Sequence, residues 1–126
     1  MSRYAVKNLM DIEPGGSDQF EIRIARKYLD SEELGVTYER LAPGFTSSDG
    51  HSHGEQEEAY VVVEGSGAIK LDDERIELKQ WDVVRVAPEV VRGLDAGPEG
   101  MVVIAVGGHK PEGGDGAMVK DRWPAT

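Results

Sequence analysis

The sequence has no cysteine among its 126 residues. This absence excludes disulfides, thiolate metal sites and a cysteine nucleophile. Any bound metal must take its protein ligands from His, Asp and Glu, and those donors favour hard or borderline metals.

Long apolar runs are also missing. The longest, residues 101–106, is far shorter than the roughly 20 residues that span a bilayer. Residues 1–16 lack the apolar core of a secretory signal peptide. We therefore expect a cytoplasmic protein that does not act at a membrane.

Basic residues are scarce. The chain has 14 Lys and Arg residues against 24 Asp and Glu residues, a formal net charge of −10. A surface that binds DNA or RNA normally shows a basic stripe, and the sequence contains none. We expect no nucleic-acid partner, and we interpret the excess acid as a contribution to solubility.

The apolar pattern predicts an all-β domain. Residues 20–25 alternate between apolar and polar side chains with the period of two that a half-buried strand requires. Turn signals recur about every 8 to 12 residues, as in a sandwich or barrel. A short helical signal at residues 30–33 is interpreted as a loop. The further strands are expected at residues 36–41, 58–64, 68–71, 75–78, 83–86 and 101–106.

The length predicts a single domain. We place it at residues 1–106, including the N-terminal strands. Residues 107–116 read GGHKPEGGDG, which is typical of a flexible connector. Residues 107–126 are therefore interpreted as a Gly-rich connector and a C-terminal tail.

Two of the three histidines lie in the stretch GHSHGEQEEAYVVVEG, residues 50–65. Side chains at positions i and i+2 of a strand point the same way, so His51 and His53 can address one point. A turn at residues 54–57 would bring a carboxylate to the same place. Two His and one carboxylate on one face suit Fe, Mn, Ni or Zn. The alternative is a surface loop whose histidines are solvated.

Two neighbouring residues, Glu57 and Glu58, could supply this carboxylate. Alternation groups Glu58 with Tyr60, and Glu57 with the more apolar set that includes Val61 and Val63. Hydrophobicity by itself therefore favours Glu57 as the residue that faces the interior.

The same stretch resembles the first motif of the cupin superfamily, which is H-x-H, three or four residues, Glu, six residues and Gly. Here Glu58 and Gly65 fit that spacing. The resemblance covers roughly residues 36–106 and implies a small cupin jelly-roll (double-stranded β-helix) barrel in which His51, His53 and Glu58 are the metal ligands. It selects Glu58 over Glu57.

The second cupin motif aligns with residues 81–92 but is degraded. Trp81 replaces its first Gly, Glu89 replaces its turn Gly, and Ala96 falls where Asn is usual. Arg92 stands at the position of the family's third His. Arginine has no lone pair and cannot replace a histidine ligand.

Two outcomes follow from Arg92. In the first, the three ligands keep a divalent metal, and Arg92 at the pocket wall draws in an anionic ligand. In the second, Arg92 pairs with Glu58 and the barrel is free of metal, although a buried pair needs good geometry.

The resemblance implies a metal-dependent protein that binds a small anionic molecule, as an oxygenase or isomerase if it is an enzyme. The implied cofactor is a divalent transition metal (Fe, Mn, Ni or Zn). Arg92 and Tyr60 are the predicted substrate-binding residues, and no catalytic residue is assigned. Similar small cupins are commonly homodimers. The alternative function is a metal-free, non-catalytic cupin that binds or senses a small metabolite.

Overall fold

The computed structural model describes residues 3–124. The strands form a curled nine-stranded sheet with antiparallel pairings. The elements in chain order are η1 (Leu9–Asp11), β1 (Gly15–Gly16), β2 (Phe20–Ile24), α1 (Arg26–Leu29), β3 (Gly35–Leu41), β4 (Gly50–His53), β5 (Glu58–Leu71), β6 (Glu74–Leu78), β7 (Val83–Val86), β8 (Arg92–Gly107) and β9 (Gly116–Val119).

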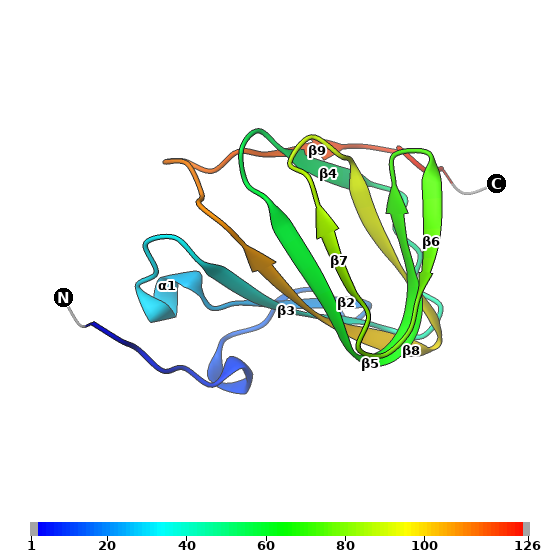
Figure 1. The fold of residues 1–126 in the computed structure, drawn as a ribbon. Helices are drawn as coiled ribbons and strands as arrows, with labels where there is room; N and C mark the ends of the chain where they lie inside the picture. Colours follow the sequence, from blue (N-terminus) through cyan, green and yellow to red (C-terminus); the bar gives the residue numbers. More distant parts are fainter. Residues whose placement is uncertain (1–2, 125–126) are drawn as a thin grey trace.

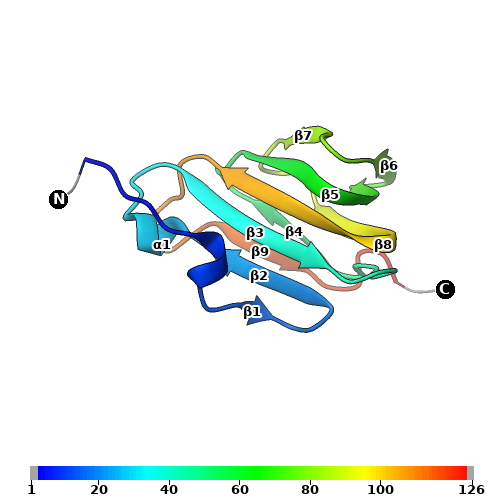
Figure 2. The same ribbon diagram turned by 90° about the horizontal axis from the view of Figure 1, so that it is seen from below.

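The two long strands β5 and β8 organise the barrel. They pair with each other along most of their length, from Glu58 opposite Gly107 to Leu71 opposite Arg92. Strands β3, β2 and β1 follow β8 on one side, and Figure 2 shows these strands lying side by side. In Figure 1 the long strands bend, so that β4 and β9 lie across the interior from β2 and β3. The all-β jelly-roll prediction is confirmed.

The bend in β5 coincides with the glycine of the first motif. The pairing of β5 with β8 shifts register between Gly65 and Gly67. Gly65 has a φ of +74°, and a Cβ added there would lie 2.2 Å from the Gly100 carbonyl oxygen. The long strand can therefore turn at this point only because residue 65 has no side chain.

The core lies between the inner faces of the long strands. Its buried members are Leu41, Tyr60, Val62, Ile69, Leu78, Val86, Leu94, Met101, Val103 and Ala105. Tyr60 and Val62 are buried, so the face of β5 that carries Glu58 is the inner one. The more apolar face of this strand points outward, and hydrophobic alternation alone would have placed Glu57 inside incorrectly.

Several predicted elements differ in extent. The segments 58–64 and 68–71 are one bent strand, β5, because the glycines between them form bulges rather than a turn. The strand expected at residues 101–106 begins at Arg92 as β8. A four-residue helix, α1, precedes the loop expected at residues 30–33.

The segment after residue 106 contributes to the barrel as well as connecting to the tail. Strand β9 pairs with β4, with Ser52 opposite Ala117. Trp123 Nε1 donates to the Asp72 carbonyl oxygen at 2.9 Å. Among the described residues, no helix has both the length and the apolarity that a membrane crossing requires.

Candidate metal centre

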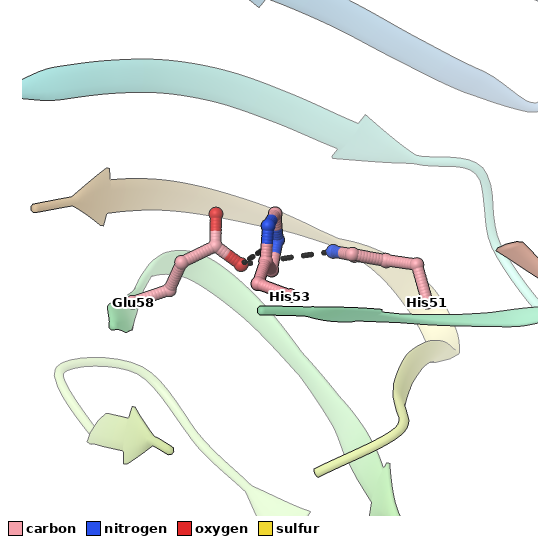
Figure 3. A group of neighbouring side chains, drawn as sticks. All are labelled: His51, His53 and Glu58. Carbon is pink, nitrogen blue, oxygen red and sulfur yellow. Dashed lines mark ion pairs between the residues drawn. The ribbon is translucent and has the colours of Figure 1, made fainter. Parts of the chain in front are cut away.

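Three side chains predicted as ligands converge at one end of the barrel. His51 and His53 lie on the same face of β4, and Glu58 is the first residue of β5. Glu58 Oε1 lies 3.6 Å from His51 Nε2 and 3.2 Å from His53 Nε2, as Figure 3 shows. One ligand atom from each residue can be chosen so that all lie within 4.8 Å of one another. This cluster could hold a metal ion with two nitrogens and one oxygen.

Asp115 holds His53 from the other side of the ring. Its Oδ1 atom lies 2.9 Å from His53 Nδ1. Its Oδ2 atom accepts the backbone N–H groups of Glu55 at 2.6 Å and Gln56 at 2.8 Å. The Glu55 hydrogen bond is the largest of the contacts that hold the pKa of Asp115 well below its ordinary value, so the carboxylate is ionised.

The geometry around His53 fits a cation. An ionised carboxylate only accepts hydrogen bonds, so the proton between the two residues is assigned to Nδ1. His53 Nε2 is buried and has no hydrogen-bond partner among the described residues. It faces Glu58 Oε1 at 3.2 Å. Two electron-rich atoms at this separation require a positive centre, which is either a proton on Nε2 or a metal ion.

Tyr60 supports Glu58 from within the barrel. Its hydroxyl donates to Glu58 Oε1 at 2.7 Å. Burial alone would raise the pKa of Glu58, but polar contacts from His51 and Tyr60 and the nearby His53 hold it at about 2. Burial and the charge of Glu58 raise the pKa of Tyr60 well above its ordinary value. Glu58 is therefore ionised and held in a fixed orientation.

Arg92 is buried beside Glu58, with only 1% of its surface exposed. Its Nη2 atom donates to the Ala87 carbonyl oxygen at 2.8 Å. Its Nη1 atom lies 3.8 Å from Glu58 Oε1, beyond hydrogen-bond distance. Nε and Nη1 are buried without a hydrogen-bond partner in the part of the chain that the structure describes. Arg92 thus forms a long ion pair with Glu58 and keeps two donor nitrogens, Nε and Nη1, without a hydrogen-bond partner among the described residues.

A pocket of about 360 Å³ opens beside the cluster at the mouth of the barrel. His53 and Glu58 reach its wall, together with the cationic side chains of Arg26 and Lys110. Arg92 and Tyr60, the predicted substrate-binding residues, lie deeper and are not among its lining residues. The full lining consists of Ile24, Arg26, Gly35, Thr37, His53, Gln56, Glu58, Ala105, Gly107, Lys110, Gly113, Gly114, Asp115 and Gly116.

Sequence reasoning missed Asp115, Arg26 and Glu39. Asp115 lies in the Gly-rich segment, which offers no periodic pattern to read. Glu39 is partly buried on the same face of β3 as the core residue Leu41, and alternation along this strand could have revealed it. Burial and the charge of Glu58 raise the pKa of Glu39 to about 7.

The degraded second motif has different consequences at its two replaced glycines. Trp81 adopts a φ of +75°, a conformation that glycine tolerates and other L residues disfavour. Glu89 does not have a positive φ, so its replacement of the turn Gly introduces no such strain. The departure at residue 81 therefore carries a backbone cost, and the departure at residue 89 does not.

A sequence profile described as "Cupin domain" matches residues 37–107, more than half of the chain. The chain belongs to the cupin family. The match covers most of β3, all of β4 to β8, and all three residues of the candidate metal centre. The resemblance inferred from residues 51–65 is thereby confirmed for the family and the fold.

Solved structures agree with this cupin's fold. A cupin protein from Bacteroides fragilis is 24% identical, with 88% of this chain and 87% of that one covered and a TM-score of 0.68. A Streptomyces protein, PAC13, determined with uridine, is 15% identical, with 96% and 93% covered and a TM-score of 0.75. At these identities the likeness establishes the fold alone.

A curated relative matches over a shorter segment. An uncharacterised protein of Methanocaldococcus jannaschii is 33% identical over 45 residues. The matched segment is 36% of this cupin and 36% of that protein. The alignment therefore spans about a third of the relative and assigns no activity.

Proposed function

We propose that this cupin binds a divalent transition metal through His51, His53 and Glu58, and binds a small anionic molecule at that metal. The observation that carries the proposal is the buried Nε2 atom of His53, which faces Glu58 Oε1 at 3.2 Å while Nδ1 is engaged by Asp115. Iron, manganese, nickel and zinc all accept such a set of two nitrogens and one oxygen.

A bound metal at this centre would supply Lewis-acid or oxygen-activating chemistry with open coordination positions. The proposed reaction class is accordingly that of an oxygenase or an isomerase. The cupin barrel supports many chemistries, so the reaction has to be established from the site and not from the fold.

The anionic character of the ligand follows from the charges around the cluster. The metal, Glu58 and Arg92 together carry a formal charge of about +2, and the ionised Asp115 beside His53 lowers the total to about +1. Arg26 and Lys110 add two cations at the entrance of the pocket. We propose that the mouth cations guide an anion inward, and that Arg92 and Tyr60 act on it from the closed end.

One observation favours the alternative, a metal-free cupin that binds or senses a small metabolite. Arg92 Nη1 lies 3.8 Å from Glu58 Oε1 and partly balances its charge. In that protein a proton on His53 Nε2 would supply the positive centre. Metal content separates the two functions because only the first requires a metal.

Elemental analysis of untreated purified protein, followed by titration with Fe²⁺, Mn²⁺, Ni²⁺ and Zn²⁺, tests the proposal. We expect about one equivalent of bound metal in the wild type and a large loss of affinity in His51→Ala, because one of three ligands is gone. A content below about a tenth of an equivalent, with no uptake on titration, would establish the metal-free alternative.

We also propose that the protein is a homodimer. The outer face of β5, β8 and β7 carries Val61, Val63, Ile104 and Val106, which are half-buried, and Val83, which is exposed. An apolar sheet face of this kind is typical of a protein interface. Light scattering should give twice the mass of the chain, and Ile104→Asp should give the monomer mass.

A further inference from the structure

Asp115 brings a carboxylate from the C-terminal segment to the candidate metal centre. It lies 62 positions after His53 in the sequence and precedes strand β9 directly. The pairing of β9 with β4, in which Gly116 lies opposite His53, brings it to the imidazole. Its side chain is 10% exposed, so the contact is largely shielded from solvent.

The two oxygens of Asp115 have separate tasks. Oδ2 accepts two backbone N–H groups of the turn between β4 and β5, from Glu55 and Gln56. Oδ1 faces His53 Nδ1 at 2.9 Å. The backbone contacts fix the carboxylate, and the fixed carboxylate then determines which ring nitrogen of His53 carries the proton.

The position of this proton decides whether His53 can be a ligand. A neutral imidazole has one N–H group and one nitrogen with a lone pair. When Nδ1 holds the proton, the lone pair is on Nε2, the atom that faces Glu58. When Nε2 holds the proton, the lone pair points at residue 115 and no ligand nitrogen faces the cluster.

We propose that Asp115 is a positioning residue of the metal centre, which fixes the proton on His53 Nδ1 and so presents Nε2 to the metal. The inference rests on the proposed metal-binding function. It makes the segment after the matched family region a part of the site, although the cupin motifs contain no residue beyond 107.

The variant Asp115→Asn tests the role of the carboxylate. The amide keeps an oxygen that can accept the N–H groups of Glu55 and Gln56, so the turn is preserved. Its NH₂ group then faces His53 Nδ1, which must become the acceptor, and the proton moves to Nε2. We expect metal affinity to fall by about 10–100-fold, the usual effect of losing such a partner.

Two measurements read the result. Long-range proton–nitrogen NMR of metal-free, nitrogen-15-labelled protein reports which ring nitrogens are protonated, and three histidines make the spectrum simple to assign. Titration with Zn²⁺ against a competing chelator gives the affinity. Asp18→Asn, an exposed change of the same type, is the matched control and should change neither result.

The proposal is supported if wild-type His53 has a protonated Nδ1, and Asp115→Asn loses that proton together with metal affinity. It is overturned if wild-type Nδ1 is unprotonated, or if Asp115→Asn binds Zn²⁺ as the wild type does. If the variant does not fold, the protonation of Nδ1 in the wild-type spectrum alone tests the proposal. A wild type that binds no metal instead refutes the proposed function, while the NMR result still reports the His53–Asp115 contact.

Discussion

The strands β5 and β8 carry two groups of buried charges. Lys70 and Asp95 form one of them, 3.0 Å apart. Glu58 and Arg92, with His53 of β4 beside them, form the other. Both groups combine cations with carboxylates away from solvent, and both are expensive to bury unless they are paired.

The two groups differ in how completely their polar atoms are used. Lys70 donates to the Ser47 carbonyl oxygen, and its ammonium lies 4.9 Å from the centre of the Trp123 ring. Asp95 also accepts the Ser47 N–H group at 3.0 Å. In contrast, the buried side-chain nitrogens without a partner among the described residues all belong to His53 and Arg92.

This difference separates a structural ion pair from a candidate binding site. Buried polar groups in folded proteins are almost always hydrogen-bonded. Several buried polar atoms without a partner in one place therefore indicate a site for a bound ion or ligand. The polar atoms of Lys70 and Asp95 find their partners in each other and in Ser47. The unpartnered nitrogens of His53 and Arg92 are the atoms that the proposed metal and the proposed anion would contact.

The largest effect is expected where the ion pair is complete. Lys70→Ala leaves the buried Asp95 carboxylate with Arg75, at 3.6 Å, as its remaining cationic partner among the described residues, and should lower the free energy of unfolding by about 3–5 kcal/mol. Urea denaturation measures it. The double variant Lys70→Met, Asp95→Leu should recover most of the loss. A loss below about 1 kcal/mol for Lys70→Ala would show that the pair behaves as a surface contact.

The second expected effect concerns Glu39, whose charge interacts with Glu58 of the candidate metal centre, and it depends on pH. Glu39 has a pKa of about 7 in the folded protein, above its ordinary value of 4.5. Its ionised form therefore destabilises the fold, fully above pH 7 and not at all below pH 4.5. In metal-free protein, Glu39→Gln should raise the free energy of unfolding by up to about 3 kcal/mol at pH 8.

Denaturation at pH 8 and at pH 4 checks this sign. The difference between Glu39→Gln and the wild type should vanish at pH 4, where the carboxyl is protonated in both the folded and the unfolded state. An equal gain at the two pH values would mean that packing, and not charge, produces the effect.

A third change probes the charge of Arg92. Arg92→Met keeps a long side chain and removes a buried cation close to the metal ligands. We expect the affinity for Zn²⁺ to rise by about tenfold, because a like charge no longer opposes the ion. Competition with a chelator measures it. Unchanged affinity for Zn²⁺ would show that the Arg92 charge is screened from the site. Weaker binding of a small anion by this variant would support the proposed role of Arg92 in ligand binding.

The smallest change lies outside both groups and calibrates the others. Trp81 has a φ of +75°, and 69% of the residue's surface is exposed. Trp81→Gly should raise the free energy of unfolding by about 1 kcal/mol, because glycine relieves a left-handed backbone strain of about 1–2 kcal/mol. Trp81→Ala, which keeps the strain, should give no gain. Equal stability of the two variants would mean that removal of the indole ring, and not relief of backbone strain, causes the change.

The short-range part of the site was readable from the sequence. His51, His53 and Glu58 lie within eight positions, on two strands joined by a tight turn. Strand alternation and motif spacing are enough to bring such residues together. The choice of Glu58 needed the motif, because the outer face of β5 is the more apolar one.

The long-range part of the site was not readable. Asp115 reaches His53 only because β9 pairs with β4, and a Gly-rich segment carries no pattern that indicates a partner strand. Arg92 could be placed by its motif position, but its closeness to the cluster required the pairing of β4 with β8, in which Arg92 lies opposite His51. Alternation could place Glu39 on the same face of its strand as Leu41, but its approach to Glu58 depended on how the barrel closes.

The sequence by itself determined the all-β barrel, the family and the three residues of the candidate metal centre, because period-two alternation and local spacing act over a few residues. The tertiary structure decided which ring nitrogen of His53 faces Asp115, how far Arg92 stays from Glu58, and that a carboxylate from the C-terminal segment contacts the cluster. Those outcomes depend on contacts between residues far apart in the chain, which no local pattern encodes.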